Sequence, residues 1–273
     1  MPTVRTSGAP RLVAALAGAG FRRYATYRQA TVAGAFTNTV FGFMRCYVLL
    51  SVADAAGQAA GYDRGQLATF VWVGQGLLAV VNNWGVLDLA DRVRTGDVVS
   101  DLLRPMDLMV NYVATDVGRA GYAALTRFVV PIAVGLLAFD LYLPTNPVSY
   151  ALFAASVVLA VLISAACRYL VGLSAFWLLD IRGVNMLWAF SSGAACGLYF
   201  PLPFLPGWLE ALLWVATPFP ALLQGPLDVL VVRGGLGHSW LLVGGQAAWL
   251  VVVVVLARTV QRRALRRLVI QGG

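Results

Sequence analysis

The sequence predicts an all-α membrane protein with six transmembrane helices, and two observations carry this prediction. Of the 273 residues, 60% are hydrophobic and 12% are charged, with a mean hydropathy of +0.77. Soluble domains are about 45–50% apolar and about 25% charged. Long apolar runs also recur at the length of roughly 20 residues that a helix needs to cross a bilayer. We expect one transmembrane domain over 1–273, in the cytoplasmic membrane of a bacterium.

Six apolar segments are candidates for the membrane spans. They are 31–53, 67–89, 121–142, 149–173, 184–202 and 239–258. Arginines are frequent before the first span, between the second and third, near the fourth-to-fifth connection and after the sixth. The other three connections carry only Arg64 and Arg233. Because cytoplasmic segments retain the excess of positive charge, both termini are expected in the cytoplasm, with 259–273 as a basic tail.

Residues 11–29 predict an amphipathic helix that lies on the membrane surface. Apolar and aromatic side chains from Leu12 to Tyr27 share one broad face, while Arg11 and Arg22 lie opposite. Such a pattern is typical of a helix in the plane of the interface. The alternative is the apolar core of a signal peptide. The basic stretch "FRRYATYR" that follows disfavours it, because positive charge opposes export.

The segment "DRVRTGDVVSDLLRPMD", residues 91–107, concentrates three arginines and four aspartates in an otherwise apolar chain. Thr95 is placed to cap a helix, with Asp97 in the first turn, where the helix dipole favours an acid. Two valines and two leucines then recur at helical spacing, while Asp101 and Arg104 point away from them. Pro105 ends the pattern. We expect a short amphipathic cytoplasmic helix that docks a partner; the alternative is a solvated loop.

Half of the twelve prolines lie between 201 and 226, around the apolar run Gly207 to Thr217. That run is too short to span a bilayer. Broken backbone at membrane depth is tolerated only where protein buries it or where it lines a cavity. Residues 203–230 therefore predict a re-entrant helical hairpin that enters from the outer face; the alternative is an exposed apolar loop. The prolines expected to shape it are Pro201, Pro203, Pro206, Pro218 and Pro220.

Two arginines fall inside predicted spans. Arg45 lies well within 31–53, and an arginine at membrane depth is a candidate functional residue. It could form a structural pair, extend its side chain to the membrane surface, line a substrate pathway, or indicate a misplaced span boundary. Arg168 lies toward the cytoplasmic end of 149–173, where extension of the side chain to the surface is expected.

The composition excludes some classes of function. All twenty Lys and Arg positions are arginine, whereas a standard P-loop needs a lysine on the nucleotide phosphates. An ATP-driven role therefore requires a separate ATPase. The net charge of +8 lies beside apolar segments, which fits membrane topology better than nucleic-acid binding. The three scattered cysteines and one histidine predict neither a metal site nor a nucleophile, and we expect no cofactor on this chain.

The stretch "RTGDVVSDLLRP", Arg94 to Pro105, resembles the R-x-G-D-x-x-x-x-L-L-R-P pattern of short ABC-2 type exporter permeases. The stretches "FWLLDIRGVNML" and "FPLPFLPGW…TPFPALLQGP" also match, and the resemblance covers about 11–267. It implies two permease chains, identical or paralogous, around a pathway, with ATP and Mg on two separate ATPase subunits. The chain would be a transport subunit rather than an enzyme. Its substrate would be a small molecule: an antibiotic, a cationic toxic compound or a lipid-like molecule.

The same resemblance implies that the short charged helix is a coupling helix, which fits a groove on the ATPase. The residues assigned to this coupling surface are Arg94, Thr95, Gly96, Asp97, Val98, Asp101, Leu102, Leu103, Arg104 and Pro105.

An ion-coupled secondary transporter is the main alternative. It would need acidic residues near the membrane midplane, often on broken helices. Four aspartates instead fall at predicted span ends, and Glu210 lies in the predicted hairpin. These aspartates are Asp54, Asp88, Asp140 and Asp180. An intramembrane enzyme is a further alternative, which the lack of a recognisable metal-ligand set or nucleophile–base pair disfavours.

Overall fold

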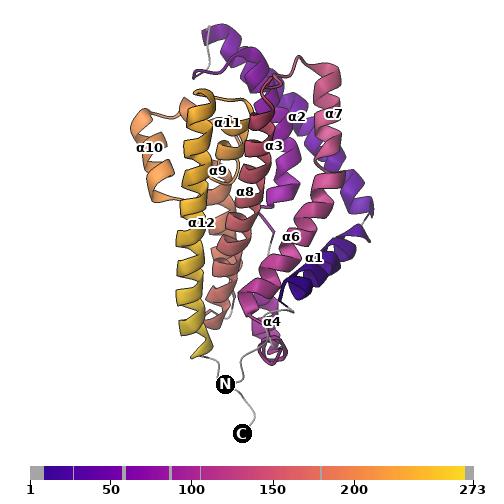
Figure 1. The fold of residues 1–273 in the computed structure, drawn as a ribbon, viewed down its shortest axis with the longest axis vertical. Coiled ribbons are helices and arrows are strands. Elements are labelled where there is room, and N and C mark those ends of the chain that lie inside the picture. Colours follow the sequence, from indigo (N-terminus) through magenta and orange to yellow (C-terminus); the bar gives the residue numbers. More distant parts are fainter. Residues whose placement is uncertain are drawn as a thin grey trace.

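The computed structural model describes residues 9–26, 28–56, 60–85, 88–104, 106–178 and 180–267, and its regular elements within these ranges are helices. Figure 1 shows the longest of them side by side in an upright bundle. Four stretches are long and apolar enough to cross a membrane: Thr31–Ala55, Leu108–Ala138, Pro147–Phe176 and Gly235–Leu265. The predicted all-α membrane fold is thus confirmed. The count of six spans stays a prediction, because the other two candidates are shorter helices.

The first helix, α1 (Ala9–Ala25), packs against α6 (Leu108–Thr126) before α2 (Arg28–Ala56) begins. The two helices touch at glycines: a Cβ on Gly118 would lie 1.8 Å from the carbonyl oxygen of Ala17. A small residue at such a crossing lets two backbones approach closely. The Phe21 ring adds an edge-to-face contact with Tyr122 at 5.5 Å. The helix predicted over 11–29 corresponds to α1, which ends at Ala25. Part of its apolar face packs against α6.

The second predicted span, 67–89, corresponds to α3 (Arg64–Val81), which ends eight residues earlier than expected. Asp63 begins α3 with a capping box that includes Gln66. Asn82 adopts a left-handed conformation, with φ +55°, and its N–H donates to the Leu78 carbonyl. Asparagine tolerates this conformation better than most residues, and it commonly ends a helix. Most residues of α3 are buried and apolar. Further apolar residues follow Val81, so the apolar run in the sequence is longer than the helix.

The third predicted span, 121–142, was placed too late in the sequence. Its first helix is α6, which starts at Leu108, because the Asp107 side chain accepts a hydrogen bond from the Val110 N–H. The apolar stretch continues as α7 (Val129–Ala138) after a short break. Asp116 and Arg119 interrupt the apolar sequence ahead of residue 121, but both are buried within α6.

These two residues belong to a buried ion-pair triad. The Asp116 carboxylate lies 2.7 Å from Arg119 Nε and 2.5 Å from Arg168 Nη2. Arg119 also donates to the carbonyls of Ala79 and Val80, at 2.6 and 2.9 Å, near the end of α3. Because helix ends leave carbonyls without an internal partner, this arginine satisfies two of them. Arg168 is buried and paired, so the expectation that it extends to the membrane surface was wrong.

The fourth predicted span agrees closely with α8 (Pro147–Leu173), which a 3-10 helix, η2 (Ser174–Phe176), follows. The fifth does not: α9 (Arg182–Ala195) ends before the predicted boundary at 202. Gly197 has φ +83°, and a Cβ there would lie 2.5 Å from the Gln224 side chain. The chain therefore turns at a glycine that packs against the next segment.

Two short helices lie within 203–230, the segment predicted as a hairpin. A 3-10 helix, η3 (Leu202–Phe204), precedes α10 (Gly207–Ala216), and α11 (Gln224–Leu230) follows. Figure 1 shows α10 at the edge of the bundle, while α11 packs against α8 and α12. The prolines lie at the junctions: Pro201 and Pro203 at η3, Pro206 before α10, and Pro218 and Pro220 in the turn before α11.

A hydrogen-bonded network holds the fully buried α11. Gln224 Nε2 donates to Tyr62 Oη at 2.8 Å and to Asp228 Oδ2 at 2.9 Å, and Tyr62 also donates to Asp228. The Gln224 side-chain oxygen Oε1 accepts a hydrogen bond from the Leu202 N–H at 2.9 Å. A second glutamine, Gln246 on α12, donates to the Ala221 carbonyl at 2.8 Å. These hydrogen bonds provide partners for backbone and side-chain polar groups, which would otherwise be buried among apolar residues without a partner.

The last helix, α12 (Gly235–Leu265), extends beyond the predicted span 239–258 at both ends and packs along α8. The predicted tail 259–273 therefore begins as helix, while 268–273 lies outside the described residues. Two further short helices, α4 (Leu89–Thr95) and α5 (Val98–Leu102), form the charged segment. In Figure 1, α1, α4 and the C-terminal end of α12 share the lower end of the bundle.

Replacing Asp116 by asparagine should strongly destabilise the bundle, because Arg119 and Arg168 would keep buried charges without a carboxylate. Loss of one partner of a buried ion pair costs about 3–5 kcal/mol. We expect a clear fall in the midpoint of thermal unfolding of the detergent-solubilised chain. Asp91→Asn is the matched control, since Asp91 pairs with Arg94 in an exposed ion pair. Equal midpoints for the two variants would contradict a structural role for the triad.

Candidate functional site

The charged segment is built from two helices rather than the single helix that was predicted. Thr95 is the last residue of α4, and Gly96, with φ +81°, separates it from α5. Thr95 therefore does not cap the second helix. Asp97 occupies that position, where its side chain makes no capping hydrogen bond and instead accepts the Thr95 hydroxyl at 2.9 Å. A glycine tolerates the left-handed turn that other residues resist, and this bends the segment.

Asp101 is the centre of this segment, although it was expected to point away from the packed face. Its carboxylate is buried and receives Arg92 through both oxygens: Nε to Oδ2 at 2.5 Å and Nη2 to Oδ1 at 3.0 Å. Two parallel charge-assisted bonds of this kind fix orientation as well as distance. The hydrogen bond to Asp101 raises the pKa of Arg92. Arg104 lies 3.8 Å away, and Tyr112 on α6 donates its hydroxyl at 3.4 Å.

The exposed surface of the segment α4–α5 has two leucines, Leu102 and Leu103, at its centre. Leu103 is 81% exposed and Leu102 is 37% exposed, whereas Val98 points inward and is buried. Arg94 is exposed and pairs with Asp91 at 3.2 Å. Val98 and Asp101, two of the residues assigned to the coupling surface, are buried and hold the segment in place. The exposed residues of that surface are Arg94, Thr95, Gly96, Asp97, Leu102, Leu103 and Arg104. Pro105 lies outside the described residues.

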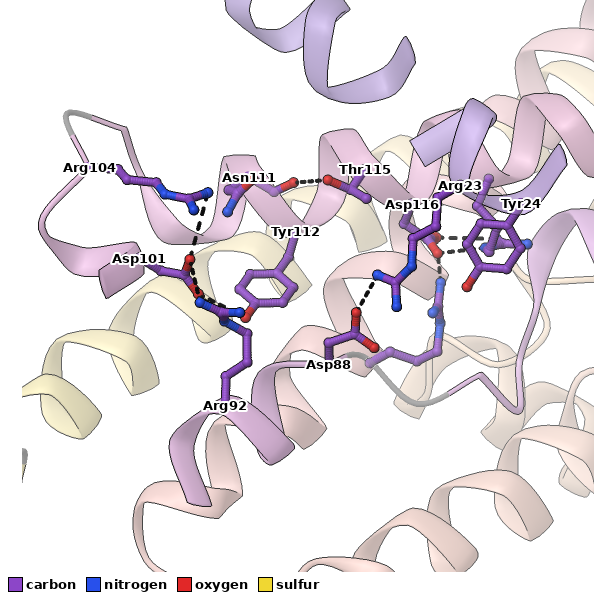
Figure 2. A pocket seen from close by; sticks show the side chains of 12 residues that line it. Arg23, Tyr24, Asp88, Arg92, Asp101, Arg104, Asn111, Tyr112, Thr115 and Asp116 are labelled. Carbon is purple, nitrogen blue, oxygen red and sulfur yellow. Dashed lines mark hydrogen bonds and ion pairs between the residues drawn. The ribbon is translucent and has the colours of Figure 1, made fainter. Parts of the chain in front are cut away.

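A polar pocket of about 180 Å³ connects this segment to the bundle. Figure 2 shows its side chains converging from α1, α4, α5 and α6. At its edge, Arg23 of α1 pairs with Asp88 at 2.5 Å, just before α4. The pocket contains Asp101 at one side and the Asp116 triad at the other. The lining residues are Arg23, Tyr24, Asp88, Arg92, Asp101, Arg104, Asn111, Tyr112, Thr115, Asp116, Arg119 and Arg168.

A second, larger cavity of about 750 Å³ lies along α2 and contains Arg45. Arg45 stands 17 residues after the first residue of α2, Arg28, and 11 before the last, Ala56, so a misplaced span boundary does not explain it. Within the part of the chain that the structure describes, it forms no hydrogen bond and no ion pair, and its Nε is buried. A structural ion pair is thus not seen there, and Arg45 stays a candidate for the pathway.

Sequence reasoning missed two buried carboxylates. Asp116 and Arg119 stand at i and i+3, a spacing typical of an ion pair on one helix, so a signal was available. Asp228 had no comparable signal, because its partners Tyr62 and Gln224 become neighbours only in the fold. Asp116 also bears on the ion-coupled alternative, since it places an acid inside the bundle. Two arginine partners stabilise its charged form, which does not favour proton uptake.

Asp101→Ala should loosen the charged segment while the bundle stays folded. Loss of the Arg92 clamp removes charge-assisted hydrogen bonds worth about 2 kcal/mol, so amide hydrogen exchange in 98–104 should accelerate roughly thirtyfold. Exchange in α8 should not change. Asp91→Ala, which removes only an exposed pair, is the control. Unchanged exchange in the Asp101 variant would show that other contacts hold α5.

Comparison with known proteins gives one match. A sequence model described as "ABC-2 family transporter protein" matches residues 36–272, which is most of the 273-residue chain. Searches of curated proteins and of solved structures found no match. The matched family agrees with the resemblance that the motifs suggested, and the apolar helical bundle is a multi-pass membrane architecture. The chain therefore belongs to the ABC-2 family of transporter proteins and is a membrane-embedded permease component of an ABC transporter.

Proposed function

We propose that the chain exports a small molecule as half of a two-chain pathway, driven by separate ATPase subunits that bind the segment α4–α5. The observation that supports this most is a pair of buried carboxylate clusters, which line one pocket between the exposed segment and the centre of the bundle. Asp101 joins α4, α5 and α6, and Asp116 joins α6, α8 and, through Arg119, α3. A solvated loop would not need such connections.

The proposed mechanism is a movement rather than a chemical step. An ATPase that closes on ATP would press against Leu102 and Leu103 and displace α5. Because Arg92 holds Asp101 through both oxygens, α4 and α5 would move together. Tyr112 and the pocket would pass this displacement to α6, and the triad would carry it to α8. Packed elements of this kind have discrete arrangements, which an ATP-dependent partner can select.

The second chain of the pathway is proposed to cover the outer face of α2. Large apolar residues on this helix are exposed, among them Phe36, Met44, Tyr47 and Val48. Lipid contact would also explain such exposure. The cavity favours a pathway at this face, because Arg45 would otherwise be a charge at membrane depth without function. The second chain could be identical or paralogous. We place both chain ends, α4 and α5 on the cytoplasmic side, as the arginine distribution predicts.

Leu102→Ala combined with Leu103→Ala should weaken binding of the ATPase subunit about tenfold or more. Burial of a leucine side chain contributes roughly 1.5–3 kcal/mol, and part of this would be lost for each residue. The measurement is titration of purified ATPase into the permease in nanodiscs. Leu137→Ala on α7 is the control, because Leu137 is 89% exposed but belongs to a different surface.

If the double variant binds the ATPase as tightly as the wild type while keeping its unfolding midpoint, then α4–α5 is not the docking segment. Weaker binding by the Leu137 variant as well would indicate a general effect of lost apolar surface rather than a docking site.

The energy source separates the proposed function from the ion-coupled alternative. Vesicles that contain the permease and its ATPase should accumulate substrate only with ATP and Mg, and vanadate should stop transport. Dissipating the proton gradient should leave the initial rate unchanged. Transport by the permease alone that collapses with the proton gradient would instead establish an ion-coupled transporter.

A further inference from the structure

The cavity along α2 combines an apolar wall with one charged side chain. It lies where α2 and α3 pack side by side, near the turn that follows α9. Its volume of about 750 Å³ is within the range of about 300–1,000 Å³ typical of small-molecule sites. Aromatic side chains account for much of its wall. They are Phe41, Trp84, Tyr199 and Phe200.

Arg45 is the charged residue of this wall, and no acidic residue lines the cavity among the described parts of the chain. The two fully buried arginines, Arg119 and Arg168, share the Asp116 carboxylate, whereas Arg45 is half-buried. Arg45 has no such partner in the described residues. A guanidinium remains charged in proteins and presents a planar set of donors that matches carboxylate or phosphate oxygens. The missing partner is therefore an anion.

A second polar group faces the same space. Gln75 on α3 lines the cavity and is 1% exposed, yet its Oε1 has no hydrogen-bond partner. Asn38 on α2 lies nearby and donates to the Gln75 backbone carbonyl at 3.0 Å. Buried polar atoms are usually paired, but this oxygen is enclosed by protein atoms, so Gln75 adds a buried polar group to the cavity wall rather than a contact for a ligand.

We propose that this cavity binds an amphiphilic anion, a molecule that joins one carboxylate or phosphate group to a hydrocarbon or aromatic body. The oxyanion pairs with Arg45, and the apolar body lies against the aromatic wall. A cationic amphiphile has no acidic residue to meet it here, and a neutral one leaves the arginine uncompensated. That such a molecule is the transported substrate rests on the proposed function; its binding to the cavity does not.

The test uses probes of equal chain length on the full permease in phosphatidylcholine nanodiscs: dibromostearate, the corresponding alcohol and the corresponding trimethylammonium compound. Bromine quenches nearby tryptophan, and Trp84 lines the cavity. We expect saturable quenching by the carboxylate at concentrations at least tenfold below those of the other two probes. Trp84→Phe should remove this saturable part and leave only the background from lipid partitioning.

Arg45→Gln should weaken binding of the carboxylate tenfold or more and leave binding of the alcohol unchanged. Arg64→Gln is the matched control, because Arg64 is an exposed arginine that pairs with Asp54 outside the cavity. Should Arg45→Gln fail to fold, Arg45→Lys must still prefer the carboxylate over the alcohol. Equal binding of the carboxylate by Arg45→Gln and the wild type, or equal binding of all three probes by the wild type, would overturn the proposal.

Two sources of the anion can be separated by adding one part in five of phosphatidylglycerol to the nanodiscs. Competition with dibromostearate would identify an anionic bilayer lipid as an occupant, whereas no competition would identify a free amphiphile. Because these measurements need no ATPase, binding could be established even if ATP-driven transport were disproved. Conversely, loss of the binding preference would leave the coupling experiments unaffected.

Discussion

The Asp116 carboxylate, shared by two buried arginines, is the interaction on which the arrangement of the bundle depends. Helices in lipid gain little from apolar burial against one another, because lipid tails are as apolar as leucine. Which helices pack together must therefore be determined by specific polar contacts and by close packing. Asp116 brings α6 and α8 together, and Arg119 extends this contact to the last carbonyls of α3. The position at which α3 can end is thereby tied to the register of α6.

A second polar centre, around Asp228 and Gln224, performs the corresponding task for the irregular segment near α11. It joins Tyr62, ahead of α3, to a helix too short to span the membrane. Between the two centres α3 buries mainly apolar side chains, including Trp72. Polar contacts thus hold the chain at two separate levels, while α2 and α10 keep large apolar side chains exposed.

The charges of this chain divide according to what they contact. Arg92, Arg119 and Arg168 have carboxylate partners and hold helices together, and one polar pocket is lined by both the Asp101 cluster and the Asp116 triad. Arg45 differs, because no described group neutralises it. In the proposed site Arg45 would bind an anion, whereas the arginines with carboxylate partners hold helices together. This division links the proposed coupling to the proposed substrate class.

The sequence by itself determined the membrane class, the helical fold, the approximate positions of α2, α8 and α12, and the ABC-2 family. The membrane class, the helical fold and these positions follow from the length and polarity of each segment, whereas the family follows from the resemblance of stretches such as Arg94 to Pro105 to a known pattern. Only the tertiary structure decided where α3, α6 and α9 end or begin, because their limits depend on contacts such as Arg119 with the α3 carbonyls. It also decided that Asp101 points inward, because Arg92 and Tyr112 converge on it. The lack of a carboxylate partner for Arg45 also depends on the tertiary structure, because such a partner could come from any segment that the fold brings near it.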